Sequence, residues 1–336
     1  MDLGPYGYYA VTIIVYFFIY NILTWGLNIQ FGYAGIPNFT YITFVAAGAY
    51  FSGALGLHPP GPFSQAHYIL GLGWPFPATM LGGAVVAALL GAAVGLVTLT
   101  RLRSDYLAIV TFSLGFIAFD FVNSFVPLFN GIDGLSGVPL PLNDTLQLDY
   151  NTYTIFYIGL SGVIMLVLWF VAHRIYNSSL GRTLRAIRED LDVAEALGKD
   201  TFRFRMIALV IGCFYAGVGG ALLLGFITAI NPSSIAAPET FVIWAALLVG
   251  GRGNNLGAVI GALVVPVLIV EGTRFIPVLA DQAALVAGLR NVVIGLLLIL
   301  ILWFRPDGLL PERKRRFFEI PVGGTATNPV SSPVTK

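Results

Sequence analysis

Two pairs of polar side chains lie inside apolar stretches of the sequence and could carry ion or proton chemistry. Asp120 and Asn123 are three residues apart, and Glu271 and Arg274 repeat that spacing, so each pair would share one face of a helix. A carboxylate in hydrocarbon is costly, so such residues often mark a transport path. One hypothesis is therefore a gradient-driven carrier that uses Asp120 or Glu271. The alternatives are a neutralised or hydrogen-bonded structural role for Asp120 and a mutual pairing of Glu271 with Arg274 near the outer interface.

The sequence offers little for covalent catalysis or metal binding. The histidines His58, His67 and His173 are scattered, and Cys213 is the only cysteine, so we expect neither a metal site nor a disulfide. Hydrolase and metalloprotease motifs do not occur, and the only Gly-Lys pair, Gly198-Lys199, lacks the preceding glycine of a phosphate-binding loop. We therefore expect a protein that is not an enzyme and binds no cofactor itself. If ATP and Mg²⁺ drive it, another chain binds them.

Residues 181–198 form a charged segment between two long apolar stretches. Apolar residues recur there at spacings of three and four, which predicts one amphipathic helix with a single apolar stripe: Leu184, Ile187, Leu191, Ala194 and Leu197. Gly198 stands where a left-handed C-terminal cap is expected. The segment is too polar to enter lipid and should lie along the membrane surface. Docking into a groove of a partner and a solvated linker helix are the two interpretations.

The composition sets the class of protein. Hydrophobic residues make up 57% of the chain and charged residues 10%, and the mean hydropathy is +0.83. These values are typical of a polytopic membrane protein. The formal net charge of +1 argues against nucleic acid as a partner, because no broad basic surface exists to bind phosphate. We expect the apolar surface of the chain to be in contact with membrane lipid.

Nine apolar segments are long enough to be membrane helices or parts of them. They lie near 8–29, 34–57, 77–100, 106–129, 153–173, 206–230, 239–251, 255–275 and 284–304. Threading them alternately puts sixteen of the eighteen Lys and Arg residues on one side, leaving Arg274 and Arg290 toward the other. The positive-inside rule then predicts a cytoplasmic C-terminus and an outward N-terminus, with 181–198 in the cytoplasm.

Glycine and asparagine interrupt the apolar pattern at 28–38 and at 250–257. Non-helical backbone at membrane depth is tolerated only against protein or water, so paired breaks can indicate a transport path. The run before the second break is short, which favours a half-helix or a re-entrant hairpin, and a re-entrant course would bring Arg252 and Asn254 to mid-membrane. Ordinary cytoplasmic turns are the alternative for both breaks. The candidate path residues are Asn38, Tyr41, Asp120, Asn123, Asn254 and Asn255.

Small residues recur every four positions at Gly83, Ala87, Gly91 and Gly95, and again at 253, 257 and 261 if a helix continues through them. This spacing lets helix backbones approach closely. Packing within this chain is favoured over a contact with another subunit.

Several motifs occur in an order that resembles the permeases of branched-chain amino-acid ABC transporters. They are Gly32-Tyr-Ala-Gly35 with Ala47-Gly-Ala-Tyr50, Arg103-Ser-Asp-Tyr-Leu-Ala-Ile-Val-Thr111, Gly131-Ile-Asp-Gly-Leu-Ser-Gly-Val-Pro139, the 181–198 segment, Asn231-Pro-Ser-Ser234, Glu239-Thr-Phe, Gly250-Gly-Arg-Gly-Asn-Asn-Leu-Gly257 and Arg305-Pro-Asp-Gly-Leu-Leu310. The match runs over residues 15–311 and is closest to the second permease subunit type.

The resemblance implies a heteromeric importer in the bacterial cytoplasmic membrane. Its expected partners are ABC ATPase subunits, a related second permease and an extracytoplasmic substrate-binding protein. The residues that would contact the ATPase are Arg185, Glu189, Asp190, Ala194, Glu195, Ala196 and Gly198.

This sequence departs from the family pattern at two places. Ala194-Glu-Ala-Leu-Gly198 replaces Glu-Ala-Ala with a more distant glycine, and Ile36-Pro-Asn-Phe-Thr-Tyr41 stands where a Leu-Ser-Leu-Gly-His-like run is expected. The second change lies near the candidate path, so the solute could be a branched-chain or other small amino acid, or urea or a short amide. A gradient-driven carrier and a non-transporting scaffold are the remaining hypotheses.

We therefore expect an all-α polytopic bundle of about 8–10 spans with broken or re-entrant segments and a cytoplasmic coupling helix. Residues 1–311 form its transmembrane domain, and 312–336 form a basic, disordered cytoplasmic tail.

Overall fold

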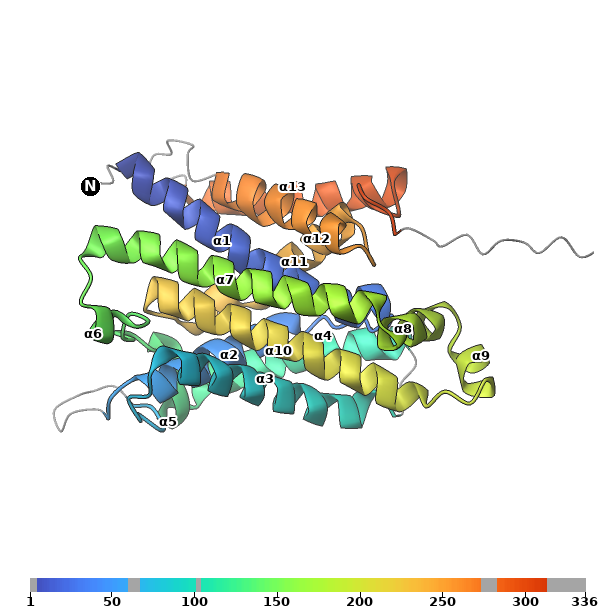
Figure 1. Ribbon diagram of the computed structural model, residues 1–336, viewed down its shortest axis with the longest axis horizontal. Helices are drawn as coiled ribbons and strands as arrows, with labels where there is room; N and C mark the ends of the chain where they lie inside the picture. The colour runs from blue at the N-terminus through green and yellow to red at the C-terminus, as the bar shows by residue number, and fades with distance from the viewer. Residues whose placement is uncertain (1–4, 60–66, 101–103, 273–282, 313–336) are drawn as a thin grey trace, which may run out of the picture.

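The computed structural model describes residues 5–59, 67–100, 104–272 and 283–312, and every regular element in these ranges is helical. The long helices run back and forth along one axis, so that loops gather at the two ends of the molecule (Figure 1). The long elements are α1 (Pro5–Leu27), α2 (Tyr41–Gly56), α3 (Phe76–Thr98), α4 (Ser104–Ser124), α7 (Tyr150–Asn177), α10 (Thr201–Ile227), α11 (Ala237–Gly250) and α13 (Ala283–Phe304). The short elements are η1 (Asn28–Tyr33), α5 (Val126–Phe129), η2 (Gly131–Asp133), α6 (Asn143–Leu146), α8 (Ser179–Glu189), α9 (Leu191–Ala196), η3 (Pro232–Ile235), α12 (Asn255–Ala262) and η4 (Leu263–Glu271). The expected all-α bundle is confirmed.

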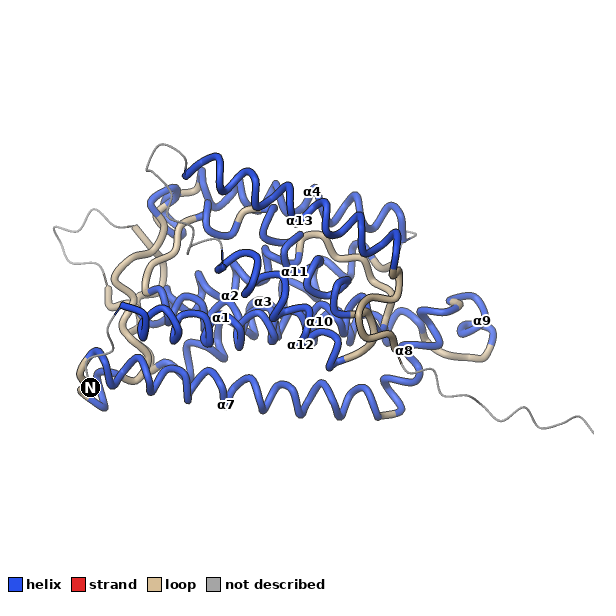
Figure 2. The backbone as a smooth tube through the Cα atoms, turned by 90° about the horizontal axis from the view of Figure 1, so that it is seen from above, coloured by secondary structure: helices blue, strands red, loops and turns tan. Residues whose placement is uncertain are grey.

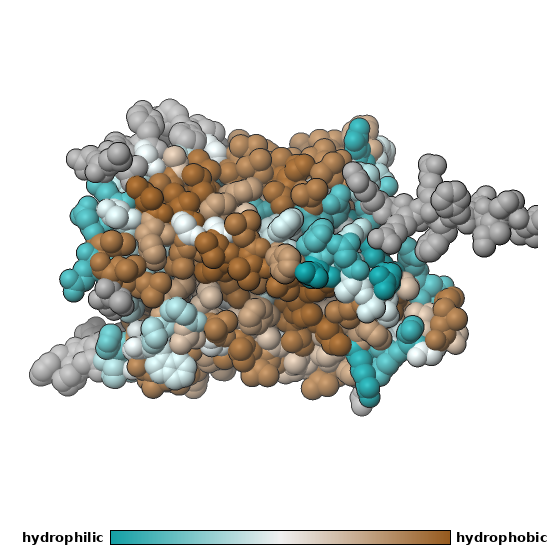
Figure 3. All heavy atoms as spheres, in the orientation of Figure 1, coloured by the Kyte–Doolittle hydropathy of each residue, from teal (hydrophilic) through white to brown (hydrophobic). Residues whose placement is uncertain are grey.

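The apolar helices match the nine predicted segments. Within the described residues, six helices are long and apolar enough to cross a membrane: Gly7–Tyr33, Phe76–Thr98, Tyr106–Ser124, Asn151–Asn177, Thr201–Ile227 and Pro232–Gly250. Three shorter apolar helices are Tyr41–Gly56, Asn255–Glu271 and Gly288–Phe304. Apolar side chains cover the middle of the face seen in Figure 3, and polar residues gather toward its ends. The molecule is a multi-pass membrane protein.

The core is built around α10, which packs against α1, α2 and α3. Small residues make these contacts possible. A Cβ at Gly217 would lie 2.7 Å from Cα of Ala84, and one at Gly91 would lie 2.5 Å from Sγ of Cys213. The ladder on α3 therefore serves packing within the chain, as predicted. The second ladder is only partly right, because Gly253 lies in a turn with φ +80° and only Gly257 and Gly261 lie on a helix.

The break at 28–38 is a buried return of the chain. The α1 helix continues as the wider η1 helix to Tyr33, and residues 34–40 then run back without helical structure until α2 begins at Tyr41. The Tyr41 hydroxyl donates to the carbonyl of Leu23 (2.9 Å), so α2 begins beside the middle of the first span. The segment is covered by protein rather than exposed as a turn, which is the condition under which irregular backbone is stable at this depth.

The break at 250–257 is a turn between two antiparallel helices. Helix α11 ends at Gly250, and α12 begins at Asn255 and continues through η4 to Glu271. The turn lies at the end of the bundle that carries α8, because Arg188, Glu189 and Arg252 line one cavity there. The re-entrant hairpin with Arg252 at mid-membrane is therefore wrong.

Helices α4 and α7 lie on opposite sides of the bundle (Figure 2). Each has much of its surface exposed: only 11% of the most apolar part of α4 and 22% of that of α7 are buried within the chain. These two helices thus provide large apolar surfaces for lipid or for another membrane protein.

Candidate functional site

The charged segment forms two helices rather than one. Ser178 caps α8 by accepting from the backbone N–H of Gly181 (3.2 Å). Asp190 leaves the helical region (φ −153°, ψ 112°) and caps α9 by accepting from the N–H of Val193 (3.0 Å). The predicted continuous helix is therefore wrong at Asp190, because aspartate is among the best N-cap residues and here starts a new helix. Gly198 has φ +75° and ends α9 in the left-handed conformation, as predicted.

Helices α8 and α9 together form the α8–α9 hairpin, residues 179–196, and its inner side is fixed to the bundle. Leu184, Ile187 and Ala194 of the predicted stripe are buried. Two arginines add polar contacts to the chain after α13. Arg188 lies 2.7 Å and Arg185 3.4 Å from the carboxylate of Glu312, and the Arg185 guanidinium stacks on the ring of Tyr176. Helix α8 is thereby held by apolar burial and by charge together.

The outer side of the hairpin is exposed. Leu197 is 74% exposed, so the predicted apolar stripe ends at Ala194 in α9 and does not reach Leu197, and Val193 beside it is 54% exposed. The break at Asp190 turns α9, and Leu197 points away from the bundle. Apolar side chains stand out at the right-hand tip of Figure 3, where Figure 1 shows α9.

The predicted contact residues divide between these two sides. Glu189, Asp190, Glu195, Ala196 and Gly198 are exposed. In contrast, Ala194 is buried and Arg185 is part of the internal anchor. Glu195 also accepts from the hydroxyl of Thr201 (2.5 Å), which ties the end of α9 to the start of α10.

A buried amide cluster surrounds η1. The side-chain oxygen of Asn255 accepts from Asn28 (3.2 Å) and from the hydroxyl of Tyr33, and Asn28 in turn accepts from the backbone N–H of Gly253 (2.8 Å). The indole of Trp25 donates to the carbonyl of Asn255 (3.0 Å). The cluster joins the first break to the second, so the two interruptions recognised in the sequence lie against each other.

A second set of buried polar side chains begins at Gln30, which also lies in η1. Asn38 donates to the amide oxygen of Gln30 (2.9 Å), and Gln30 donates to the carbonyl of Leu209 (3.0 Å). The indole of Trp244 donates to the carbonyl of Asn38 (3.1 Å). Asn38 is thus a buried link between the 34–40 segment, η1, α10 and α11, and Tyr41 is equally buried.

The other candidate path residues lie elsewhere. Asn254 caps α12 by accepting from the N–H of Leu256 (3.0 Å) and donates to the carbonyl of Leu310 (3.3 Å). Asp120 is exposed on α4, and Asn123 is half-buried. Glu271 is buried at the end of η4, whereas its predicted partner Arg274 lies outside the described residues. The six candidates therefore do not form one site.

Sequence reasoning missed several residues of these clusters. Asn28, Gln30 and Tyr33 lie within or beside the recognised break, and their polarity inside an apolar span was an available signal. Glu312 was assigned to the disordered tail, yet it pairs with α8. No local pattern signals that contact, because its partners are more than 120 residues away. Residues 313–336 of the predicted tail lie outside the described residues.

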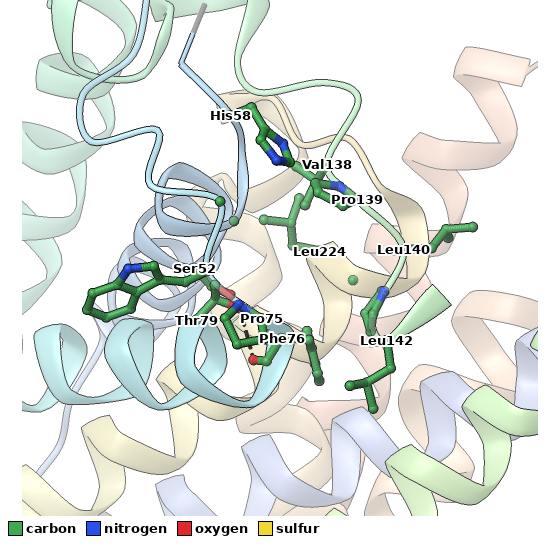
Figure 4. Close-up of a pocket in the computed structure, with 15 residues that line it drawn as sticks. Ser52, His58, Pro75, Phe76, Thr79, Val138, Pro139, Leu140, Leu142 and Leu224 are labelled. Carbon is green, nitrogen blue, oxygen red and sulfur yellow. Dashed lines mark hydrogen bonds between the residues drawn. The ribbon is translucent and has the colours of Figure 1, made fainter. Parts of the chain in front are cut away.

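Among the described residues, two of the larger cavities lie away from α8. One of about 200 Å³ is at the opposite end of the bundle, where Ser52, Thr79 and His58 are its polar lining residues and proline and leucine side chains from 138–142 face them (Figure 4). The other, of about 480 Å³, lies between α2 and α4 and is lined almost entirely by apolar side chains, with Thr40 and Thr43 as exceptions. The described residues contain no group of three or more metal-ligating side chains.

Comparisons with known proteins find similar sequences among transport permeases. The family model described as "branched-chain amino acid transport system / permease component" matches residues 9–302. A high-affinity branched-chain amino acid transport system permease protein LivM of Salmonella typhimurium is 29% identical over 313 residues, covering 87% of this chain and 68% of that protein.

Two further relatives bear on the type of subunit. A probable branched-chain amino acid transport permease protein LivM of Methanocaldococcus jannaschii is 28% identical, covering 90% of this chain and 93% of that protein. The LivH permease protein of Salmonella typhimurium is 37% identical over 135 residues, which is 40% of each chain. No solved structure matches the chain significantly. Because the family model covers most of the sequence, the chain belongs to the branched-chain amino acid transport system permease family.

Proposed function

We propose that this chain is one permease of an ATP-driven importer, and that the α8–α9 hairpin is the surface on which a separate ATPase subunit docks. The observation that carries the proposal is the two-sided hairpin: an inner side anchored by Leu184, Ile187 and Glu312, and an outer tip that exposes Val193 and Leu197 among acidic residues. Exposed apolar side chains with a charged rim are typical of a protein contact.

The contacts of α8 provide a route from this tip to the interior. The Arg188 guanidinium donates to the carbonyl of Gly32 in η1, and η1 holds the amide cluster with Asn255 and Gly253. A displacement of α8 would therefore move the break in the first span and the turn between α11 and α12 together. Such a coupled, packed network is what alternating access driven from outside the membrane requires.

The proposal includes the sidedness of the chain. The hairpin lies at one end of the bundle and α1 begins at the other (Figure 1). With the hairpin in the cytoplasm, the positive-inside rule is obeyed, the N-terminus faces outward and the C-terminus faces inward. The cavity lined by Ser52, His58 and Thr79 then faces the side from which an extracytoplasmic binding protein would deliver solute.

Co-purification with the ATPase and ATP-driven uptake test the docking surface. We expect Leu197→Asp, and the charge reversals Glu189→Lys and Glu195→Lys, to reduce both. Leu309→Asp is the matched control, because Leu309 is an exposed leucine on the segment after α13 and not on the hairpin. The proposal is wrong if the hairpin variants keep full complex formation and uptake, or if liposomes containing this chain alone transport solute on an ion gradient without ATP.

The proposed solutes are branched-chain or other small amino acids, as the family description indicates. The unusual run Ile36–Tyr41 lies in the buried return beside Gln30 and Trp244, so urea or a short amide is the competing solute class. Calorimetry on the binding protein of the same system separates them, since leucine and urea differ in charge and in apolar surface.

A further inference from the structure

Asp120 lies on the outer surface of a membrane helix. Its side chain is exposed on α4, and it makes no ion pair or side-chain hydrogen bond with the parts of the chain that the structure describes. Most of the exposed side chains around it on this helix are apolar, among them Phe116, Ile117 and Phe121. A carboxylate among such side chains needs an explanation from outside the chain.

The depth of Asp120 follows from its neighbours. Helices α2 and α4 run toward the same end of the bundle, and a Cβ at Gly115 would lie 3.1 Å from the hydroxyl of Thr40, directly before α2. Asp120 is five residues, or about 7.5 Å, beyond that level, whereas α2 continues for roughly 24 Å. The carboxylate therefore lies on the order of 16 Å short of the end of α2. It is at membrane depth and not in the headgroup region.

Asp120 belongs to a stripe along α4. Exposed residues recur at spacings of three and four on this face: Tyr106, Ile109, Ser113, Ile117, Asp120 and Ser124. This is the spacing by which one helix packs against another. Polar side chains at Asp120 and Ser124 interrupt the apolar ones, as they do where membrane helices bond across an interface, whereas the Ser113 hydroxyl donates to the carbonyl of Ile109 within α4 (3.0 Å).

At membrane depth and among exposed apolar side chains, lipid and protein are the possible neighbours of this stripe. Lipid would leave the carboxylate without a partner, which is the costliest arrangement for a charged group in a membrane. A second permease, which is the partner that the family resemblance implies for such an importer, can supply a hydrogen-bond donor or a cation at the same depth. The chain matches LivM proteins over most of its length and LivH proteins over a smaller part, so two permease types are related to it.

We infer that the α4 face bearing Ser113, Ile117 and Asp120 is the contact surface for a LivH-like permease, and that Asp120 accepts a hydrogen bond or ion pair from that partner within the membrane. The inference rests on the proposed importer function and adds a related second permease as its partner in the membrane. The inference says which face of this chain makes the contact, at what depth, and which residue selects the partner. Asp120 selects the partner because only a chain with a hydrogen-bond donor at this level satisfies the carboxylate.

Site-specific photo-crosslinking tests the face. A benzophenone-bearing amino acid replaces Ile117 on α4, or Val163 on α7 as the matched control, in cells that also produce an epitope-tagged LivH-like permease of the same genome. The two positions are 63% and 61% exposed, and their helices, α4 and α7, lie on opposite sides of the bundle (Figure 2). We expect a crosslink to the tagged permease from 117 and not from 163.

Substitution of Asp120 tests the residue. Asp120→Leu leaves the partner's donor unsatisfied and should lower the yield of the tagged permease on co-purification at least about tenfold. Asp120→Asn keeps an acceptor and should retain most of it. If Asp120 faced lipid, Asp120→Leu would leave the yield unchanged or increase it.

The outcomes separate this inference from the proposed function. Crosslinking from Val163 instead of Ile117, crosslinking only to a second copy of this chain, or full co-purification of Asp120→Leu would overturn the inference. ATPase binding through α9 is measured on the same preparations. Loss of ATPase binding with an intact crosslink at 117 would refute the coupling surface and leave the permease contact standing.

Discussion

Replacing Glu312 by glutamine tests whether charge holds the α8 helix on the bundle. Glu312→Gln keeps the size of the side chain and removes its charge from between Arg185 and Arg188. The three side chains are between 15% and 22% exposed. Hydrogen bonds to charged groups contribute about 1.5–3 kcal/mol when buried and exposed ion pairs about 0.2–1 kcal/mol. For this half-buried pair of contacts we expect a loss of about 1–2 kcal/mol, or roughly 5–30-fold in the ratio of docked to undocked α8.

Hydrogen–deuterium exchange reads that ratio directly. An undocked helix of eleven residues is marginal in water, so its amides exchange whenever it leaves the bundle. The amides of residues 183–189 should exchange roughly 5–30 times faster in the variant, and those of 217–222 in α10 should not change. Glu189→Gln is the control, because Glu189 is exposed on the same helix and makes no ion pair within the described residues. Equal exchange in the two variants would show that apolar burial alone fixes α8.

Three further substitutions test the packing, the amide cluster and the cap. Gly261→Ala places a Cβ on the carbonyl oxygen of Ala246 and should cost about 1–3 kcal/mol, lowering the melting temperature in detergent by several degrees, whereas Gly159→Ala, with open space around it, should not lower it. Asn255→Ala removes the acceptor of two buried donors and should cost about 1–3 kcal/mol by chemical denaturation, with recovery in Asn255→Asp refuting a purely steric role. Gly198→Ala forces an L-residue into φ +75°, which costs about 1–2 kcal/mol and should unwind the exposed end of α9, so ATPase binding should weaken severalfold; an unchanged affinity would mean that the end of α9 is not part of the contact.

Local patterns predicted much of this protein. Apolar length located the nine membrane segments, and the four-residue spacing from Gly83 identified close packing on α3. The apolar stripe correctly placed Leu184 and Ile187 inside. Each of these features depends on residues that are neighbours on a single helix, so the period of the sequence is sufficient.

Features that depend on distant contacts were not predictable in the same way. The break at Asp190 turns Leu197 outward, and aspartate at that position fits both a helix surface and an N-cap. Asn38 was assigned to a path, yet its partners are Gln30 and the indole of Trp244, 206 residues away. Polar residues inside a membrane protein can line a path or satisfy buried backbone, and the sequence alone does not distinguish the two.

The buried return at 34–40 has a consequence for how the chain is made. Its backbone is satisfied in part by the side chains of Thr111 on α4 and Trp244 on α11, which leave the ribosome much later. Until those helices arrive, the first two spans would present bare peptide groups to lipid. Biogenesis must therefore keep the opening third of the protein sheltered, at the insertion machinery or in a shallow position, and forms truncated before α11 should be degraded rather than accumulate.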